Sequence, residues 1–293
     1  MEGTGAEIAG NTNNTQAVIY STASVVIEDV EVVRGTAQPQ RIIYVNGADF
    51  VKIDSCIVHS FLSYAGDKTM VYLNASRIDI YNNLLYDGQA TGNVAALFTY
   101  GDYVSIVNNS IHDFYATQLL GTAIGYGILV YVDPVKTANV YNNTITEIVA
   151  ATAVQQFTYC YYFYDLGGNL NYSNNISDDS TAPGSNSQTG VSYTEIFLDA
   201  DIADFRLTLL SVARDAGTDR SADINDDIIG TVRPVGVTWD IGAFEWFAIF
   251  EGEILEGIST VTIVKTKNSE VTIEKELDSE VTTELNEISK VYD

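Results

Sequence analysis

The chain has 293 residues with 14 basic and 39 acidic side chains, which gives a formal net charge of −25 and a pI near 4.1. A surface this acidic repels phosphate groups, so we expect neither nucleic acid nor an anionic membrane as a partner. The sequence shows no basic and apolar leader and no bilayer-length apolar run, so we expect neither a signal peptide nor membrane insertion.

A short apolar strand followed by a polar pair, most often Asn-Asn, recurs through the first two thirds of the chain. The copies are residues 27–32, 53–58, 80–85, 106–111, 140–145 and 172–176. The first residue of the pair stands at positions 29, 55, 82, 108, 142 and 174, so the repeat is 26 to 34 residues long. A repeat of this length, built from alternating strands without a helical period, indicates a β-solenoid.

Each copy buries its apolar face only against its neighbours. Val104, Ile106 and Ile111 alternate with polar residues, so one face of that strand is expected to point inward. An Asn pair ends a strand well because asparagine bonds to nearby backbone and tolerates the left-handed αL conformation. We therefore predict an all-β fold in which residues 1–192 form stacked parallel coils.

Coils stack about 4.8 Å apart, a spacing at which amide side chains in successive coils can hydrogen-bond to one another. We expect the first asparagine of each pair to form such a structural ladder. Its members are Asn82, Asn108, Asn142 and Asn174.

The aromatic run at residues 157–164 breaks the alternation. Aromatic side chains there face both ways, which suits sugar stacking and an oligomer interface equally. From this run we take Tyr161, Tyr162 and Tyr164 as candidate ligand-binding residues.

Acidic residues follow the strands at one register position, in the row Ser60, Asp87, Asp113 and Glu147. If the coils stack, these acids are about 5 Å apart per step. Two carboxyl groups near that separation can serve a glycosidase as acid and nucleophile or base, and neighbouring negative charges raise the pKa of one of them. Asp87, Asp113 and Glu147 are the candidate catalytic residues.

The preceding register position holds Tyr86 and His112, which we take as candidate ligand-binding residues. Acids at a strand exit are also ordinary turn residues, and the same row could hold calcium, as in β-helix lyases that act on uronates. No arginine or lysine base stands near the row, and no metal-ligand spacing occurs. We expect Cys56 and Cys160 to be buried free thiols.

After a polar linker at 178–192 the pattern changes to a new set of motifs. These are Phe-Leu-Asp at 197–199, Asp-Phe-Arg-Leu at 204–207, Ala-Arg-Asp-Ala-Gly at 213–217, Arg-Pro at 233–234 and Trp-Asp-Ile-Gly-Ala-Phe-Glu at 239–245. They resemble the C-terminal segment of secreted parallel β-helix repeat proteins of the choice-of-anchor Q and polymorphic outer-membrane type. One departure is Ser211-Val212-Ala213-Arg214, where that family has a small residue, proline and alanine before Asp-Ala-Gly.

The resemblance covers residues 193–247, which we call the closing segment. It implies a right-handed, single-stranded parallel β-helix like that of pectate lyases, in agreement with the handedness of parallel crossovers, and it implies no single activity. We expect this segment to cap the coils, held by Arg233 with Asp240 or Glu245. The nearby acids Asp219, Asp223, Asp226 and Asp227 make calcium a candidate cofactor.

Residues 248–293 contain an acidic connector and a ten-residue repeat that begins at Ser259, Ser269, Ser279 and Ser289. These decads resemble repeats near the ends of phage virion proteins, and their thin apolar stripe cannot fold alone. We expect them to hold a homo-oligomer, a trimer, through residues 259–293; the alternative is a solvated tail.

The sequence favours a non-enzymatic structural or adhesive protein of a virion appendage or cell-surface fibre, extracellular and able to contact glycans. One alternative is a carbohydrate-active enzyme, either a polysaccharide lyase or a glycoside hydrolase. A second alternative is a fragment of a secreted bacterial surface protein.

Overall fold

In a computed structural model, structure is described for residues 6–9, 17–33, 41–63, 68–118, 121–152, 155–247, 261–265 and 271–275. The chain divides into two units, residues 1–247 and 248–293, so the closing segment belongs to the same unit as the coils. The fold is all-β, as predicted, with 60% of the described residues in strands and 3% in helix. Within the described residues no helix has the length and apolar character needed to cross a bilayer.

Two parallel sheets form the coils of the first unit. The seven-stranded sheet contains, in order, β1 (Ala6–Ala9), β4 (Val30–Val33), β6 (Ile57–Ser63), β8 (Leu84–Ala90), β11 (Ser110–Gln118), β14 (Thr144–Thr152) and β17 (Ile176–Ser177). The second sheet runs in the order β15 (Gln155–Asp165), β12 (Thr122–Val132), β9 (Val94–Tyr100), β7 (Lys68–Tyr81), β10 (Tyr103–Val107), β13 (Thr137–Tyr141) and β16 (Asn169–Ser173). Strand β5 (Arg41–Asp54) joins this sheet beside β7, and β2 (Ala17–Ser21) and β3 (Val25–Glu28) pair with β5.

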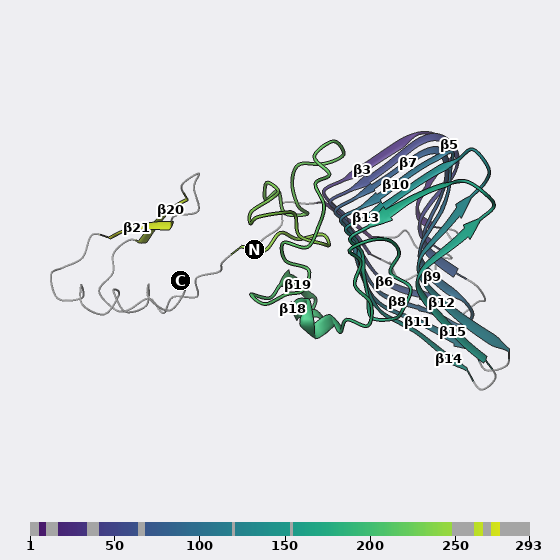
Figure 1. The fold of residues 1–293 in the computed structure, drawn as a ribbon. Helices are drawn as coiled ribbons and strands as arrows, with labels where there is room; N and C mark the ends of the chain where they lie inside the picture. The colour runs from purple at the N-terminus through teal and green to yellow at the C-terminus, as the bar shows by residue number, and fades with distance from the viewer. Residues whose placement is uncertain are drawn as a thin grey trace. The chain divides into compact units, whose positions relative to one another are not determined.

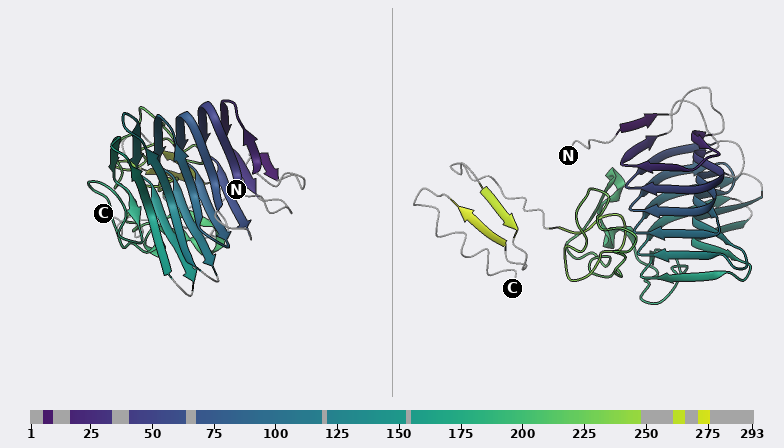
Figure 2. Two further views of the ribbon diagram at one scale, coloured as in Figure 1. Left: turned by 90° about the vertical axis from the view of Figure 1, so that its right-hand side faces the viewer. Right: turned by 90° about the horizontal axis from the view of Figure 1, so that it is seen from above.

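The strands make a solenoid-like stack. Figure 1 shows them in rows around a shared interior, and Figure 2 shows the strands of a row lying side by side. The register predicted from the repeat is confirmed, since Ile80 pairs with Ile53 on one side and with Ile106 on the other. The apolar core fills the interior between the rows, and it includes Val104, which is 1% exposed.

Each coil turns a corner at the first residue of the repeated pair. All six such residues have a positive φ, between 52° and 56°, at Asp29, Ser55, Asn82, Asn108, Asn142 and Asn174. Asparagine and aspartate enter this αL region at lower cost than other residues with a side chain. The polar residue at this position is therefore explained by the backbone of the corner.

The amide ladder lies one residue later than the sequence analysis placed it. The inner asparagines, Asn83, Asn109, Asn143 and Asn175, bond to one another through the stack, with amide N to O distances of 2.9, 3.0 and 3.2 Å. Each inner asparagine also donates to a main-chain carbonyl of the preceding coil. They lie inward because they follow the corner, where the chain has already turned back toward the core.

Cys56 occupies the same position in the coil before Asn83. Its Sγ lies 3.5 Å from the carbonyl oxygen of Ile27, where the later coils place an asparagine amide, and its backbone N–H donates to Asn83 Oδ1 at 3.0 Å. The thiol therefore replaces the asparagine amide at this ladder position with a weaker hydrogen-bond donor. Cys56 and Cys160 are both buried and free, as expected.

The corner asparagines, Asn82, Asn108, Asn142 and Asn174, bind the closing segment. Their amides donate to the carbonyl oxygens of Asp226, Asp240, Thr218 and Ala216 respectively, at 2.8 to 3.0 Å. Within this row only Asn142 donates to another corner asparagine, Asn108, at 3.2 Å. The row is thus mainly a docking edge, which the sequence analysis had interpreted as the ladder.

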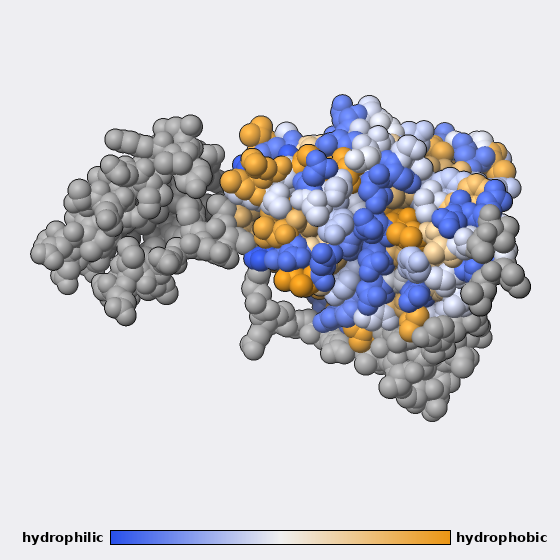
Figure 3. All heavy atoms as spheres, turned by 90° about the horizontal axis from the view of Figure 1, so that it is seen from below, coloured by the Kyte–Doolittle hydropathy of each residue, from blue (hydrophilic) through white to orange (hydrophobic). Residues whose placement is uncertain are grey.

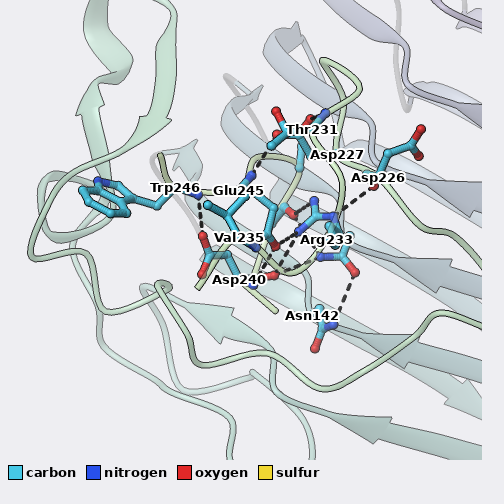
Figure 4. A network of polar contacts seen from close by, with 12 residues as sticks. Asn142, Asp226, Asp227, Thr231, Arg233, Val235, Asp240, Glu245 and Trp246 are labelled. Atoms are coloured by element: carbon cyan, nitrogen blue, oxygen red, sulfur yellow. Dashed lines mark hydrogen bonds and ion pairs between the residues drawn. The ribbon is translucent and has the colours of Figure 1, made fainter. Parts of the chain in front are cut away.

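The closing segment contains η1 (Tyr193–Glu195), β18 (Phe197–Asp199), η2 (Ala200–Ile202) and β19 (Asp204–Leu207), and it lies beside the corner row (Figure 1). Arg233 is its buried centre: all five guanidinium N–H donors have acceptors, as Figure 4 shows in part. Arg233 pairs with the Glu245 carboxylate at 2.7 Å, with both side chains fully buried. The Asp240 carboxylate instead accepts from the backbone N–H groups of Asp215 and Trp246.

In the second unit, β20 (Val261–Lys265) pairs antiparallel with β21 (Val271–Lys275). These strands coincide with the first two decads. The later decads and the predicted oligomer contacts lie outside the described residues.

Asn109→Ala removes a ladder amide that makes five buried hydrogen bonds. Because unsatisfied buried groups cost about 1 to 3 kcal/mol each, we expect a loss of roughly 3 to 6 kcal/mol in the free energy of unfolding, measured by urea denaturation. The matched control is Asn171→Ala, which removes an exposed amide with one bond to Asn139 at 3.1 Å. Equal losses in both variants would contradict the account of the ladder.

Arg233→Met leaves the buried Glu245 carboxylate without its cation. Removing one partner of a buried pair costs about 3 to 5 kcal/mol, so we expect a loss of that size in denaturant titration. Arg206→Met, in a partly exposed pair with Asp204, should cost less than about 1 kcal/mol. The double variant Arg233→Met/Glu245→Gln should recover part of the loss; no recovery would show that the pair is not the cause.

Candidate functional site

The predicted acidic row forms a second αL position in the coils. Ser60, Asp87, Asp113 and Glu147 have φ between 56° and 59° and stand outside the strand pairing of β6, β8, β11 and β14. The backbone therefore explains Asp87 and Asp113, because aspartate tolerates this conformation. The same conformation does not favour glutamate, so the backbone does not explain why residue 147 is a glutamate.

A cleft of about 400 Å³ opens between this row and the closing segment. The coils contribute Tyr86, Asp87, His112, Asp113 and Glu147, and the closing segment contributes Tyr193 and residues 200–203. The structure thus brings together all three predicted catalytic residues and two of the five predicted ligand-binding residues. In Figure 3 hydrophilic residues form a band across one face of the stack, with apolar patches on either side.

His112 is a buried residue in the lining of the cleft. It is 5% exposed and lies against Tyr193 and Phe205, with ring centroids 5.1 and 5.5 Å away. Burial lowers the His112 pKa from 6.5 to about 4, although the charge of Asp201 opposes this, so the ring is neutral at pH 7. Its Nδ1 lies 2.9 Å from Thr146 Oγ1, and among the described residues Nε2 has no hydrogen-bond partner.

Burial and neighbouring carboxylates raise the pKa of two acids in the cleft, Asp113 and Glu147. Loss of hydration raises the pKa of Asp113, and the negative charges of Asp87 and Asp201 add to it. The Glu147 pKa is also raised, by burial first and then by Asp178, Asp113 and Asp201. Both carboxyl groups therefore hold a proton at a higher pH than a free side chain does, as a general acid requires.

Asp201 and Tyr193 are site residues that the sequence analysis missed. Tyr193 donates its hydroxyl to Asp201 Oδ1 at 3.2 Å, and this carboxylate raises the tyrosine pKa. Both stand in the closing segment, 46 and 54 residues after Glu147, the last of the predicted acids. No spacing in the sequence signals this contact, because it depends on how the closing segment docks.

The predicted aromatic residues of β15 stand apart from the cleft. Tyr161 is 3% exposed and donates its hydroxyl to the carbonyl oxygens of Asn143 and Ile176, so its ring is unavailable to a ligand. Tyr162 packs on Tyr126, and Tyr164 stacks on Tyr131 with centroids 4.7 Å apart. All three tyrosines contribute to packing, although Tyr164 is 45% exposed.

A divalent metal finds little support in the cleft. Within the described residues, the group of three acidic or sulfur ligands that lies within 4.8 Å is Cys160, Asp178 and Asp179. None of the three lines the cleft, although Asp178 accepts from the backbone N–H of Glu147 at 2.6 Å. There the Asp179 carboxylate already accepts from the backbone N–H groups of Cys160 and Thr181. The cleft acids and the acidic string of the closing segment form no such group, so the calcium hypothesis gains no geometric support.

No family model, curated protein or solved structure matches the chain. The resemblance of the closing segment to secreted β-helix repeat proteins, and of the decads to phage virion proteins, stays a prediction from the sequence.

The pH dependence of stability tests the environment of His112. A histidine in the unfolded chain gains a proton near pH 6.5, whereas folded His112 does so only near pH 4. Between these values the unfolded state alone is protonated, so the free energy of unfolding falls as the pH falls.

We expect His112→Gln to lose less stability than the wild type between pH 7 and pH 4.5, by roughly 2 to 3 kcal/mol, in urea titrations at both pH values. Asp113 and Glu147 act in the opposite direction but are common to both proteins. Parallel pH profiles for the two proteins would show that His112 is not held neutral.

Proposed function

We propose that the protein is a saccharide-binding structural protein of a virion appendage or cell-surface fibre. In this proposal it is a right-handed parallel β-helix, and its cleft binds a glycan. The observation that carries the proposal is the cleft itself, which joins four carboxyl groups, a neutral buried histidine and a tyrosine hydroxyl in one opening of a closely packed stack. Carboxylates and imidazole accept hydrogen bonds from hydroxyls, and the cleft volume falls within the range of ligand sites.

The rest of the unit supports a rigid scaffold. The amide ladder joins the coils, and Phe197 and Phe205 of the closing segment pack against His112 of the cleft, so a ligand would meet a preformed site. Extracellular location and trimer assembly through residues 259–293 complete this proposal, and both rest on the sequence.

Binding to an array of oligosaccharides, followed by calorimetry on each hit, tests the proposal. The conservative changes Asp113→Asn and Glu147→Gln should weaken binding of a hit about tenfold or more, since each removes a charge-assisted hydrogen bond worth roughly 1.5 to 3 kcal/mol. Asp49→Asn, an exposed site on β5 outside the cleft, should leave affinity unchanged. An array without any hit, or a hit insensitive to both cleft changes, would count against the proposal.

Glycoside hydrolysis is the second candidate. The favouring observation is that Asp113 and Glu147, in adjacent coils, both have a raised pKa beside further carboxylates. If the protein is a hydrolase, the hit from the array should release reducing ends, and Glu147→Gln and Asp113→Asn should each reduce the rate at least a hundredfold. If the saccharide binds but no reducing ends are released, only the structural role is supported.

A further inference from the structure

The lining of the cleft is acidic without a compensating cation. Four of its ten residues are Asp87, Asp113, Glu147 and Asp201, and none of the ten is lysine or arginine. Of the other charges near the row, Asp178 is also negative and raises the pKa of Glu147. Low-dielectric walls focus such a field, so the cleft attracts cations and repels anions.

The spacing of the carboxyl groups bears on which cation fits. Among the described residues, the cleft acids do not bring three ligand atoms within 4.8 Å of one another. A calcium ion needs several oxygens at about 2.3 to 2.6 Å around one centre. Acids spread along successive coils about 4.8 Å apart instead suit positive charges that are spread along a molecule.

His112 provides the second observation, independent of the acids. It is 95% buried, it lines the cleft, and its Nε2 has no hydrogen-bond partner among the described residues. Nε2 is not one of the fully buried side-chain atoms that lack a partner, so it is accessible from the cleft to a ligand. A neutral imidazole beside the Tyr193 hydroxyl fits a ligand hydroxyl, which a simple polyamine or a metal ion does not offer.

Together these observations define the ligand class. We infer that the cleft binds a glycan that contains unacetylated amino sugars, whose ammonium groups meet the carboxylates while a hydroxyl meets His112. This inference rests on the proposed function and narrows it. It also excludes uronates, the substrates of polysaccharide lyases, because their carboxylates would face the cleft acids.

Three matched tetrasaccharides test the inference by calorimetry at pH 7 and low salt: β-1,4-linked glucosamine, its fully N-acetylated form and α-1,4-linked galacturonate. We expect the glucosamine tetramer to bind at least tenfold more tightly than the acetylated one, and the galacturonate tetramer not to bind. The preference should shrink at 0.5 M salt, because screening weakens charge interactions.

Variants distinguish binding in the cleft from non-specific attraction of a cationic ligand to an acidic protein. Asp201→Asn and Glu147→Gln should each lower the preference for the glucosamine tetramer about threefold or more, whereas Asp49→Asn should preserve it. Equal losses in all three variants would assign the binding to overall charge and overturn the inference. So would tetralysine binding as tightly as the glucosamine tetramer, since it lacks hydroxyl groups for His112.

The outcomes distinguish the inference from the function on which it rests. If the acetylated tetramer binds as tightly as the glucosamine tetramer, and the cleft variants weaken both, the inference is overturned and saccharide binding stands. If the galacturonate tetramer binds best, the inference is likewise overturned. If neither these probes nor the array yields a saccharide that binds, the proposed function itself fails.

Discussion

The Asn-Asn corner is the constraint on which the rest of this structure depends. Its first residue adopts the αL conformation and turns the chain, and its second residue points inward and bonds to the coils on either side. This pair fixes both the shape and the register of each coil. A register slip by one residue would bury the corner side chain and expose the ladder amide.

The candidate site follows from that register. With the corners aligned, the second αL position of β8, β11 and β14 places Asp87, Asp113 and Glu147 in one line. The same corners hold the closing segment through their amides, and the closing segment supplies Tyr193 and Asp201 as the opposite wall. Scaffold and site are therefore two consequences of one repeated dipeptide.

The sequence was sufficient for the features that repeat. The all-β stack, its register and the row of acids all come from local pattern. For Arg233 the sequence left Asp240 and Glu245 as alternative partners, and the structure pairs it with Glu245. The sequence was insufficient where the role of a residue depends on whether its side chain points into the core or away from it. The ladder lies at Asn109 rather than Asn108, and Tyr161 faces the core. The Asp201 contact depends on docking between distant segments, which no local period encodes.

The most direct test of the account is histidine NMR during titration with a saccharide that binds. The chain has two histidines, His59 and His112, so their imidazole signals can be assigned by one substitution. The account predicts that the His112 signal shifts and saturates with the binding isotherm, because its Nε2 gains a partner in the cleft. An unchanged His112 signal at full saturation would place the ligand elsewhere and contradict the central claim.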